Sequence, residues 1–272
     1  MNTPTTLIWF RRNLRLTDNT ILQTAAQQGQ PMRAVFLIDK ATLAHPRQAT
    51  FISAALIELK ATLAHHRLPL TILAEEAETA IPRLAAEFNA AIVITDENHQ
   101  PAIVERDNRI WQLLNQSARQ LIRLPDSAIL AKAEVMTANG QPFTNFTAYQ
   151  TEWSKVYMRR YTGWQIPNYL PELTRLQSQI PFSNTPFTFE IEWSTPHSSA
   201  NFAPNEEAAL TQLNEILFST ENNPIEHNFP AKKSTSMLSP YLSSGLLSPR
   251  KTAQITSQAN HSADNNCLIG LI

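Results

Sequence analysis

The chain is poor in several residues that mark common protein classes. Cys267 is its only cysteine, so no disulfide can form within the chain. Glycine occurs only five times in 272 residues, and no glycine-rich loop of the kind that surrounds a phosphate is present. No apolar stretch approaches the roughly 20 residues of a membrane-spanning helix. These shortages argue against a disulfide-rich secreted domain, a P-loop nucleotide site and a transmembrane protein.

Neither sign of charge dominates the sequence. Lysine and arginine total 22, aspartate and glutamate total 23, and the net charge is −1. The whole chain is therefore not basic enough to predict nucleic-acid binding, and any contact with DNA would need a local patch. Residues 1–6 contain no basic side chain, and the apolar run over 7–10 is too short for a signal peptide. We expect a cytoplasmic protein without membrane attachment.

The first 125 residues alternate between strand and helix patterns. Short apolar runs at 7–10, 34–38, 70–73, 91–94 and 121–124 are typical of buried strands. Apolar residues recur at helical spacing over 21–28, where Thr17 and Asp18 signal the helix start, and over 51–64, 79–88 and 101–117. This order predicts right-handed βαβ units. We therefore expect a doubly wound α/β domain with a parallel five-stranded sheet over residues 1–130.

Such sheets bind ligands at the carboxyl ends of their strands. The polar residues expected at that edge are Arg11, Arg12, Asp39, Asp96 and Glu97. For Arg11, Arg12 and Arg15, an exposed loop with structural ion pairs is the simpler interpretation. A phosphate site or a brace between two domains is the alternative.

The pattern changes after residue 130, where we expect a linker over 131–204. Within it, residues 149–160 are predicted to be helical, with Trp153 and Tyr157 on one packed face. Residues 166–204 are rich in proline and show no periodicity, which predicts a connector without folded structure of its own. Asn205 is a helix-start signal, and we expect a second, all-helical domain over 205–272.

Two further helix starts lie in that second domain. Ser239 and Ser248 each precede a proline, which places a capping hydroxyl before a proline at the first helical position. Thr235 and Ser236 add hydroxyl groups just upstream of Ser239, and such a helix end suits a phosphate or pyrophosphate. From spacing alone, ordinary helix capping is the more economical interpretation.

Several motifs along the chain occur together in one order. They are TLIWFRRNLRLTDN at 6–19, PRQA at 46–49, FTAY at 146–149 with Trp153, FP at 229–230, TSMLSPYL at 235–242 and LSPR at 247–250. In this order they resemble the signatures of the DNA photolyase/cryptochrome family. The resemblance implies a Rossmann-like antenna domain, a linker and a helical domain that holds FAD. It also implies light-driven repair of cyclobutane pyrimidine dimers flipped out of damaged DNA.

Single residues can be carried over by their place in these motifs. The resemblance implies that the flavin phosphates are lined by Thr235, Ser236, Met237, Leu238 and Ser239. Asn223 stands where the family has a tyrosine that contacts the flavin, and His227 where it has an arginine that faces DNA. Glu105 stands at the position of a folate-binding glutamate, which makes methenyltetrahydrofolate a candidate antenna pigment. No catalytic residue and no metal ligand are predicted.

The C-terminal residues differ from the family pattern. Cys267 and Gly270 replace the expected tryptophan and glutamate that contact the lesion, and the motif that should follow them is absent. We therefore expect a C-terminally truncated, monomeric photolyase in which FAD binding and repair are weakened or lost. The alternatives are a non-catalytic light-sensing, antenna or nucleotide-binding module, and a decayed gene product. A truncated helical domain would also leave Leu238, Leu242, Leu246, Leu247 and residues 268–272 partly exposed.

Overall fold

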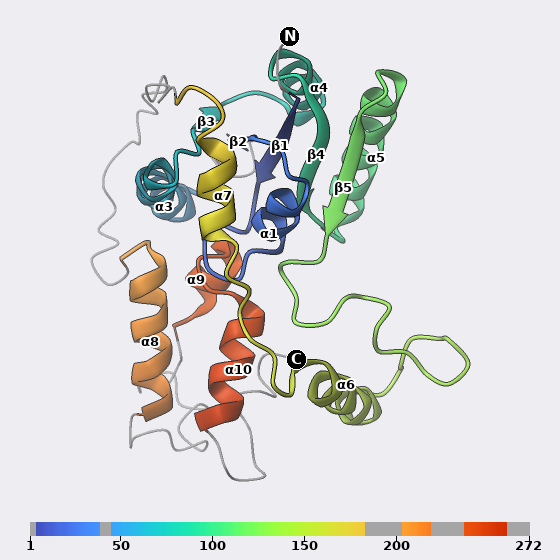
Figure 1. The fold of residues 1–272 in the computed structure, drawn as a ribbon. Coiled ribbons are helices and arrows are strands. Elements are labelled where there is room, and N and C mark those ends of the chain that lie inside the picture. The colour runs from blue at the N-terminus through green and yellow to red at the C-terminus, as the bar shows by residue number, and fades with distance from the viewer. Residues whose placement is uncertain (1–3, 39–44, 183–202, 219–236, 260–272) are drawn as a thin grey trace.

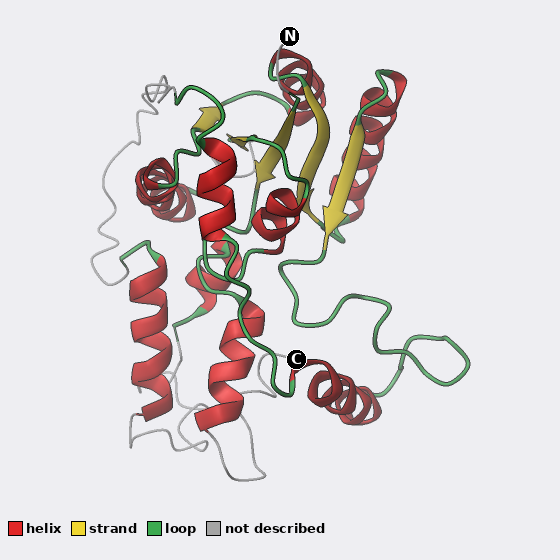
Figure 2. Ribbon diagram, viewed as in Figure 1, coloured by secondary structure: helices red, strands yellow, loops and turns green. Residues whose placement is uncertain are grey.

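A computed structural model describes residues 4–38, 45–182, 203–218 and 237–259. Its centre is an all-parallel sheet of five strands in the order β3-β2-β1-β4-β5 (Figures 1 and 2). The strands are β1 (Thr5–Phe10), β2 (Met32–Leu37), β3 (Leu70–Leu73), β4 (Ala90–Asp96) and β5 (Gln120–Leu124). All six residues of the central strand β1 are buried. The predicted doubly wound α/β fold is confirmed, and each predicted strand corresponds to an observed one.

Helices cover both faces of the sheet because side chains of a strand alternate in direction. Ile8 and Phe10 face a core shared with α1 (Thr20–Gln27), α3 (Pro46–His65) and α7 (Leu170–Gln177). Leu7 and Trp9 face the other core, which α4 (Ala77–Glu87) and α5 (Pro101–Gln116) close.

The start of α1 differs from the prediction. Thr17 and Asp18 were expected to begin this helix, but Asn19 is the N-cap and its side-chain oxygen accepts the N–H groups of Ile21 and Leu22. Asp18 instead adopts a positive φ of 49°. Its carboxylate turns toward the C-terminal helices, which frees the next residue to cap α1.

The prediction that residues 166–204 form an unstructured connector is wrong in part, because α7 lies within it. Leu173 and Leu176 of α7 are fully buried in the core beside α1. The side chain of Gln177 donates to the carbonyl of Met32 and accepts its N–H, so it holds the first residue of β2. This short helix begins beside prolines, which hid its periodicity.

The aromatic face of α6 (Phe146–Tyr161) packs as predicted. Trp153 and Tyr157 are 3% and 4% exposed, and their rings stack with centroids 5.1 Å apart. They form a separate core cluster with Ile129 and with Ala253 from the C-terminal part.

Three described helices follow the linker: α8 (Glu206–Phe218), α9 (Ser239–Ser244) and α10 (Pro249–Ala259). The expected exposure is wrong for Leu238, Leu246 and Leu247, which are buried in the same core as the sheet and α3. It is confirmed for Leu242, which is only partly buried against that core. Residues 260–272 lie outside the described residues.

Gly245 ends α9 at a close approach of two backbones. Its φ is +72°, and a Cβ built on it would collide with the backbone carbonyl of Arg12. The N–H of Leu14 donates to the carbonyl of Ser244 in the same contact. Only glycine fits here, because the position needs both a left-handed conformation and the absence of a side chain.

Substitution Gly245→Ala tests this contact. We expect the free energy of unfolding to fall by about 3 kcal/mol or more, from backbone strain and from overlap with Arg12. Gly140→Ala is the matched control, since Gly140 has φ +70° with nothing within 4 Å. Its free energy of unfolding should fall only by the cost of the backbone strain, roughly 1–2 kcal/mol. Equal losses in chemical denaturation of the two variants would show that the contact is unimportant.

Candidate functional site

A pocket of about 380 Å³ opens at the carboxyl edge of the sheet. Its walls come from the ends of β1 and β2, the first turns of α3, α4 and α5, and from α9. The central strand β1 lies between β2 and β4, so the crossovers leave it in opposite directions. This is the topological switch point at which doubly wound sheets bind ligands, as the sequence predicts.

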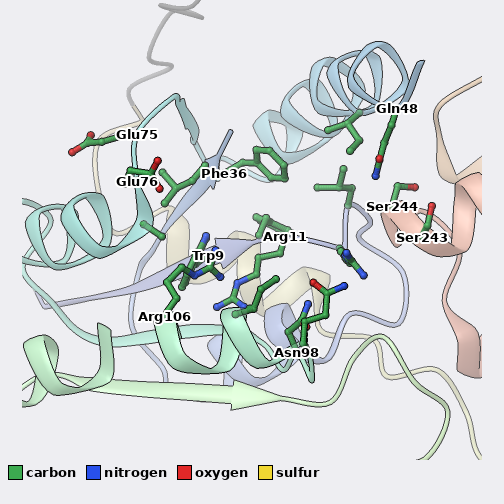
Figure 3. A pocket seen from close by; sticks show the side chains of 18 of the residues that line it. Trp9, Arg11, Phe36, Gln48, Glu75, Glu76, Asn98, Arg106, Ser243 and Ser244 are labelled. Carbon is green, nitrogen blue, oxygen red and sulfur yellow. Dashed lines mark hydrogen bonds between the residues drawn. The ribbon is translucent and has the colours of Figure 1, made fainter. Parts of the chain in front are cut away.

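One wall of the pocket is a stack of cations on an indole ring. The guanidinium of Arg11 lies 3.8 Å from the centroid of the Trp9 ring, and that of Arg106 lies 5.2 Å from it. Asp107 binds both cations, with 2.8 Å from Arg11 Nη1 to Oδ2 and 3.0 Å from Arg106 Nη2 to Oδ1. Figure 3 shows Trp9, Arg11 and Arg106 gathered at this wall. Because a guanidinium has about five N–H donors, each arginine keeps further N–H groups for a ligand after it has paired with Asp107.

Arg11 uses few of its donors. Its Nε and Nη2 atoms are buried and make no hydrogen bond within the described part of the chain. Burial lowers the pKa of this guanidinium, while the carboxylates of Asp96 and Asp107 oppose that effect. An arginine nevertheless stays charged at neutral pH. A buried cation with unused N–H groups beside a pocket can bind an anion, because a ligand would satisfy the missing hydrogen bonds.

Asp96, the last residue of β4, lies behind this wall. Its side chain is 1% exposed, and its Oδ1 atom lies 3.9 Å from Arg11 Nε, too far for a hydrogen bond. Burial raises the pKa of Asp96 to about 6, although Arg11 acts in the opposite direction. The carboxylate is therefore only partly neutralised by the nearest cation.

The rest of the pocket lining mixes apolar, polar and charged groups, and the charged or titratable ones are Arg12, His45, Glu75 and Glu76. Phe36 and Ile52 supply apolar surface, while Gln48, Ser243 and Ser244 supply hydrogen-bonding groups (Figure 3). A cavity with an apolar wall, a few polar groups and a cation at one end suits a planar aromatic ligand that carries an anionic group.

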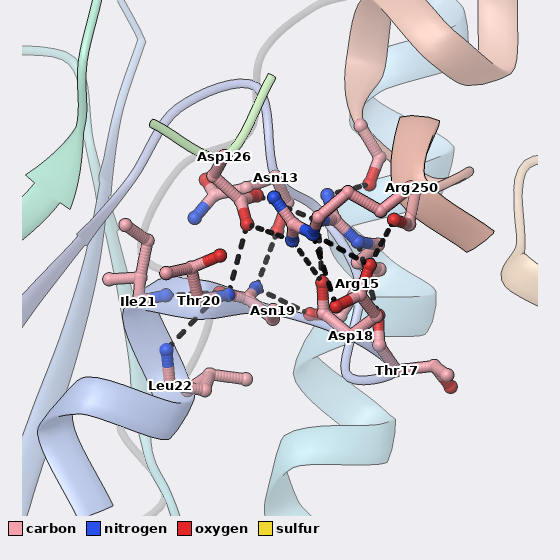
Figure 4. Close-up of polar contacts among 12 residues, drawn as sticks. Asn13, Arg15, Thr17, Asp18, Asn19, Thr20, Ile21, Leu22, Asp126 and Arg250 are labelled. Atoms are coloured by element: carbon pink, nitrogen blue, oxygen red, sulfur yellow. Dashed lines mark hydrogen bonds and ion pairs between the residues drawn. The ribbon is translucent and has the colours of Figure 1, made fainter. Parts of the chain in front are cut away.

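A second group of charges connects this edge to the C-terminal helices. Asp126 accepts from Arg15 Nη2 at 2.8 Å and from Arg250 Nη2 at 2.9 Å, and Arg250 Nε lies 3.1 Å from Asp18 Oδ2. Ser248 donates to the same carboxylate of Asp18. Figure 4 shows these residues converging from the loop after β1, the loop after β5 and α10. Arg15 is 1% exposed, so the exposed-loop interpretation is wrong for this residue and the brace is correct, whereas Arg12 is exposed as that interpretation expected.

The charges of this brace are arranged to stabilise the ionised state of Asp126. Burial alone would raise its pKa, but Arg15, Arg250 and the N–H of Thr20 together lower the pKa of Asp126 to about 2. Its contribution to stability is complete above the unfolded-state pKa of about 3.9 and is lost as the pH falls through about 2.

The residues predicted for flavin and DNA lie mostly outside the described ranges. Asn223, His227, Thr235 and Ser236 are among the residues that the structure does not describe. Met237, the first described residue of the segment 235–239, is 48% exposed at a positive φ of 52°. The flavin role of these residues stays a prediction.

The two predicted caps behave differently. Ser239 is the first residue of α9, and Leu238, which is buried, takes the N-cap position without a side-chain hydrogen bond. The hydroxyl of Ser248 accepts the N–H of Lys251, as a cap of α10 should. Helix capping is thus confirmed at Ser248 and wrong at Ser239.

The antenna prediction placed the ligand next to Glu105, which is exposed on α5 and is not among the residues that line the pocket. Arg11 and Asp96 were correctly predicted at the strand ends. Trp9 and Arg106 were not predicted as site residues. Apolar residues in buried strands and arginines on helices are common in sequences whether or not they form a site. The available signal was the position of Trp9 at the end of a predicted strand, directly before the basic segment that begins at Arg11.

The described residues hold no group of three or more histidine, cysteine, aspartate or glutamate side chains that could bind a metal ion. Among the same residues, no helix is long and apolar enough to cross a membrane.

Comparison with known proteins gives consistent matches. A family model described as DNA photolyase matches residues 6–171. The deoxyribodipyrimidine photo-lyase of Vibrio cholerae is 30% identical over 263 residues, which cover 90% of this chain and 53% of that protein. A bacterial class III photolyase structure from Agrobacterium tumefaciens has a TM-score of 0.74 at 20% identity and covers 99% of this chain and 56% of the other.

An archaeal photolyase structure from Sulfolobus tokodaii, described with two FAD molecules and with the implication of a novel light-harvesting cofactor, has a TM-score of 0.63 at 17% identity. It covers 96% of this chain and 56% of the other. The chain thus spans about half the length of these three photolyases.

The brace predicts a specific response to acid and to mutation. Asp126→Asn should lower the free energy of unfolding at neutral pH by about 3–5 kcal/mol, because two buried guanidinium groups lose their shared carboxylate. Between about pH 4 and pH 2 the wild type should lose stability more steeply than the variant. Chemical denaturation across this range measures both effects. Glu87→Gln, which removes an exposed partner of Arg83, should change stability by less than about 1 kcal/mol. Equal effects of the two substitutions would contradict a structural role of the brace.

Proposed function

The chain belongs to the DNA photolyase family, and on that premise we propose that it serves light-driven DNA repair by holding an antenna pigment in the pocket at the carboxyl edge of the sheet. The observation that carries this proposal is Arg11, which faces the pocket beside Trp9 with two buried nitrogen atoms that make no hydrogen bond in the described part. A pigment with a planar ring and an anionic group would satisfy both features.

Each wall has a distinct task in such a complex. Arg11 would bind the anionic group by charge-assisted hydrogen bonds, with Asp107 and Trp9 keeping the guanidinium in place. Phe36 and Ile52 would exclude water from the ring, and the hydroxyl groups of α9 would orient its polar edge. When bound, the pigment would absorb light and pass the energy on.

The repair step itself would need FAD and damaged DNA. The residues proposed to hold the flavin are Asn223 and the segment from Thr235 to Ser239, and the residue proposed to face DNA is His227. Cyclobutane pyrimidine dimers are the proposed lesion. All of this extends the family's activity to the chain and is supported by the family match and the ordered motifs.

A second candidate function is an antenna or nucleotide-binding module without repair activity. The pocket favours it, because its lining comes from the α/β domain and α9 and binding there needs no flavin. Leu238, one of the proposed flavin residues, is committed to the apolar core. Both candidate functions place a ligand in the pocket, and only the first includes DNA repair.

Fluorescence titration of the purified full chain with FMN, FAD and methenyltetrahydrofolate tests the pocket. Arg11→Gln should weaken binding of an anionic pigment by roughly 10-fold to 100-fold, the loss of charged hydrogen bonds. Arg109→Gln is the matched control, since Arg109 lies on α5 in an exposed pair with Glu78, and it should bind as tightly as the wild type. Equal affinities of the two variants for every pigment would remove the pocket from the proposal.

Repair is measured separately. Loss of pyrimidine dimers from irradiated DNA under blue light, with reduced FAD supplied, supports the photolyase function. Pigment binding without any light-dependent loss of dimers supports the antenna or nucleotide module instead.

A further inference from the structure

Behind the cation wall of the pocket lies one carboxylate that the proposed ligand contact does not use, and it is not itself a lining residue. Asp96 ends β4 directly behind Arg11, and its only close cation is Arg11 Nε at 3.9 Å among the described residues. Thr95 Oγ1 lies 3.5 Å from Asp96 Oδ1, a weak hydrogen bond at best. Arg11 Nη1 is committed to Asp107, but Nε and Nη2 are not committed to any acceptor in the described part. Asp96 and a ligand anion would therefore draw on the same unsatisfied side of Arg11.

The charges around Asp96 come from three elements. The segment after β1 contributes Arg11, α5 contributes Arg106 and Asp107, and the loop after β5 contributes Asp126. Both neighbouring aspartates disfavour the charge on Asp96, and burial disfavours it more strongly than either. Arg11 and Arg106 carry two positive charges against Asp107, so the wall has a surplus of one positive charge when Asp96 is neutral. It has none when Asp96 is ionised.

We propose that Asp96 is a specificity-determining residue of this pocket, which competes with the ligand anion for Arg11 and thereby couples the preference for anionic ligands to proton binding. The inference rests on the proposed function in one respect, namely that a ligand enters the pocket. It goes beyond that function by assigning the pocket a ligand charge and a condition under which that charge is favoured.

The direction of the pH effect follows from the two charge states. Below about pH 6, Asp96 holds a proton and Arg11 is free to attract an anion. As the pH rises through about 6, Asp96 ionises and neutralises Arg11. Affinity for an anion should therefore fall as the pH rises, while affinity for a neutral ring should stay constant. By linkage, a bound anion must in turn favour the protonated form of Asp96.

Two flavins with the same ring system but different net charge distinguish the effect of ligand charge from the effect of ligand shape. Lumiflavin is neutral, and carboxymethylflavin carries one carboxylate that stays ionised from about pH 5 to about pH 8. For the wild-type full chain, we expect carboxymethylflavin to bind roughly tenfold more tightly at the lower pH than at the higher, with lumiflavin unchanged. In Asp96→Asn, which removes the charge and keeps the shape, carboxymethylflavin should bind tightly at both pH values.

Glu97→Gln is the matched control, because Glu97 is the next residue and its side chain is 40% exposed. It removes the same charge at the surface and should keep the wild-type pH dependence. Thermal denaturation checks that each variant is folded, and Asp96→Asn should be at least as stable as the wild type at neutral pH, since a buried carboxylate with a raised pKa is destabilised when ionised.

The outcomes distinguish this inference from the proposed function. If lumiflavin binds and carboxymethylflavin shows the same pH dependence in wild type and Asp96→Asn, the inference is wrong and the pocket proposal stands. If neither flavin binds, the pocket proposal is wrong for flavins, and sulfate then decides the inference because it needs only Arg11. A sulfate-induced rise in melting temperature that grows at low pH in the wild type and is independent of pH in Asp96→Asn supports it. Equal rises in both proteins at every pH overturn it.

Discussion

Asp126 accepts hydrogen bonds from two buried guanidinium groups, and the docking of the C-terminal helices on the sheet depends on that arrangement. Arg15 comes from the segment after β1 and Arg250 from α10, so the carboxylate joins parts of the chain that are more than a hundred residues apart. Desolvating these charges is costly, and the cost is recovered only when every charge is paired and hydrogen-bonded. Arg15 meets this condition by also donating to the carbonyls of Thr17, Asp18 and Gly245. The brace therefore fixes the loop, the sheet edge and the helices in one arrangement.

Asp96 and Asp126 show how similar residues acquire different roles at one sheet edge. Both are almost fully buried, and burial alone would raise the pKa of each. Asp126 has two cations and the N–H of Thr20 within hydrogen-bonding distance, and these reverse the effect of burial. Asp96 has one cation at 3.9 Å and is repelled by Asp126 itself. A fully paired carboxylate serves the fold, whereas a partly paired one remains able to titrate beside a ligand.

Local sequence patterns predicted the elements well and their long-range partners poorly. Period and composition were sufficient for all five strands, since buried parallel strands are short apolar runs whatever their partners. The helix α7 was missed because its eight residues allow barely two turns of periodicity between prolines. Burial of Arg15 could not be predicted from its neighbours, because its carboxylate partner lies 111 residues away. The same reason explains the pocket: the strand-end position identified Arg11 and Asp96, but only the folded chain brings Arg106, Ser243 and Ser244 beside them.

The pocket and the brace are mechanically connected, because α9 takes part in both. Ser243 and Ser244 line the pocket, while the next residue, Gly245, contacts the backbone of Arg12 and accepts a hydrogen bond from Arg15. A ligand that touches both Arg11 and α9 can bind fully only when α9 is docked. By mass action such a ligand must stabilise the docked arrangement, and a change that lowers the docked fraction must lower the apparent affinity of the ligand by that fraction. The sheet edge thus joins ligand binding to the placement of the helices that follow, without requiring a separate moving part.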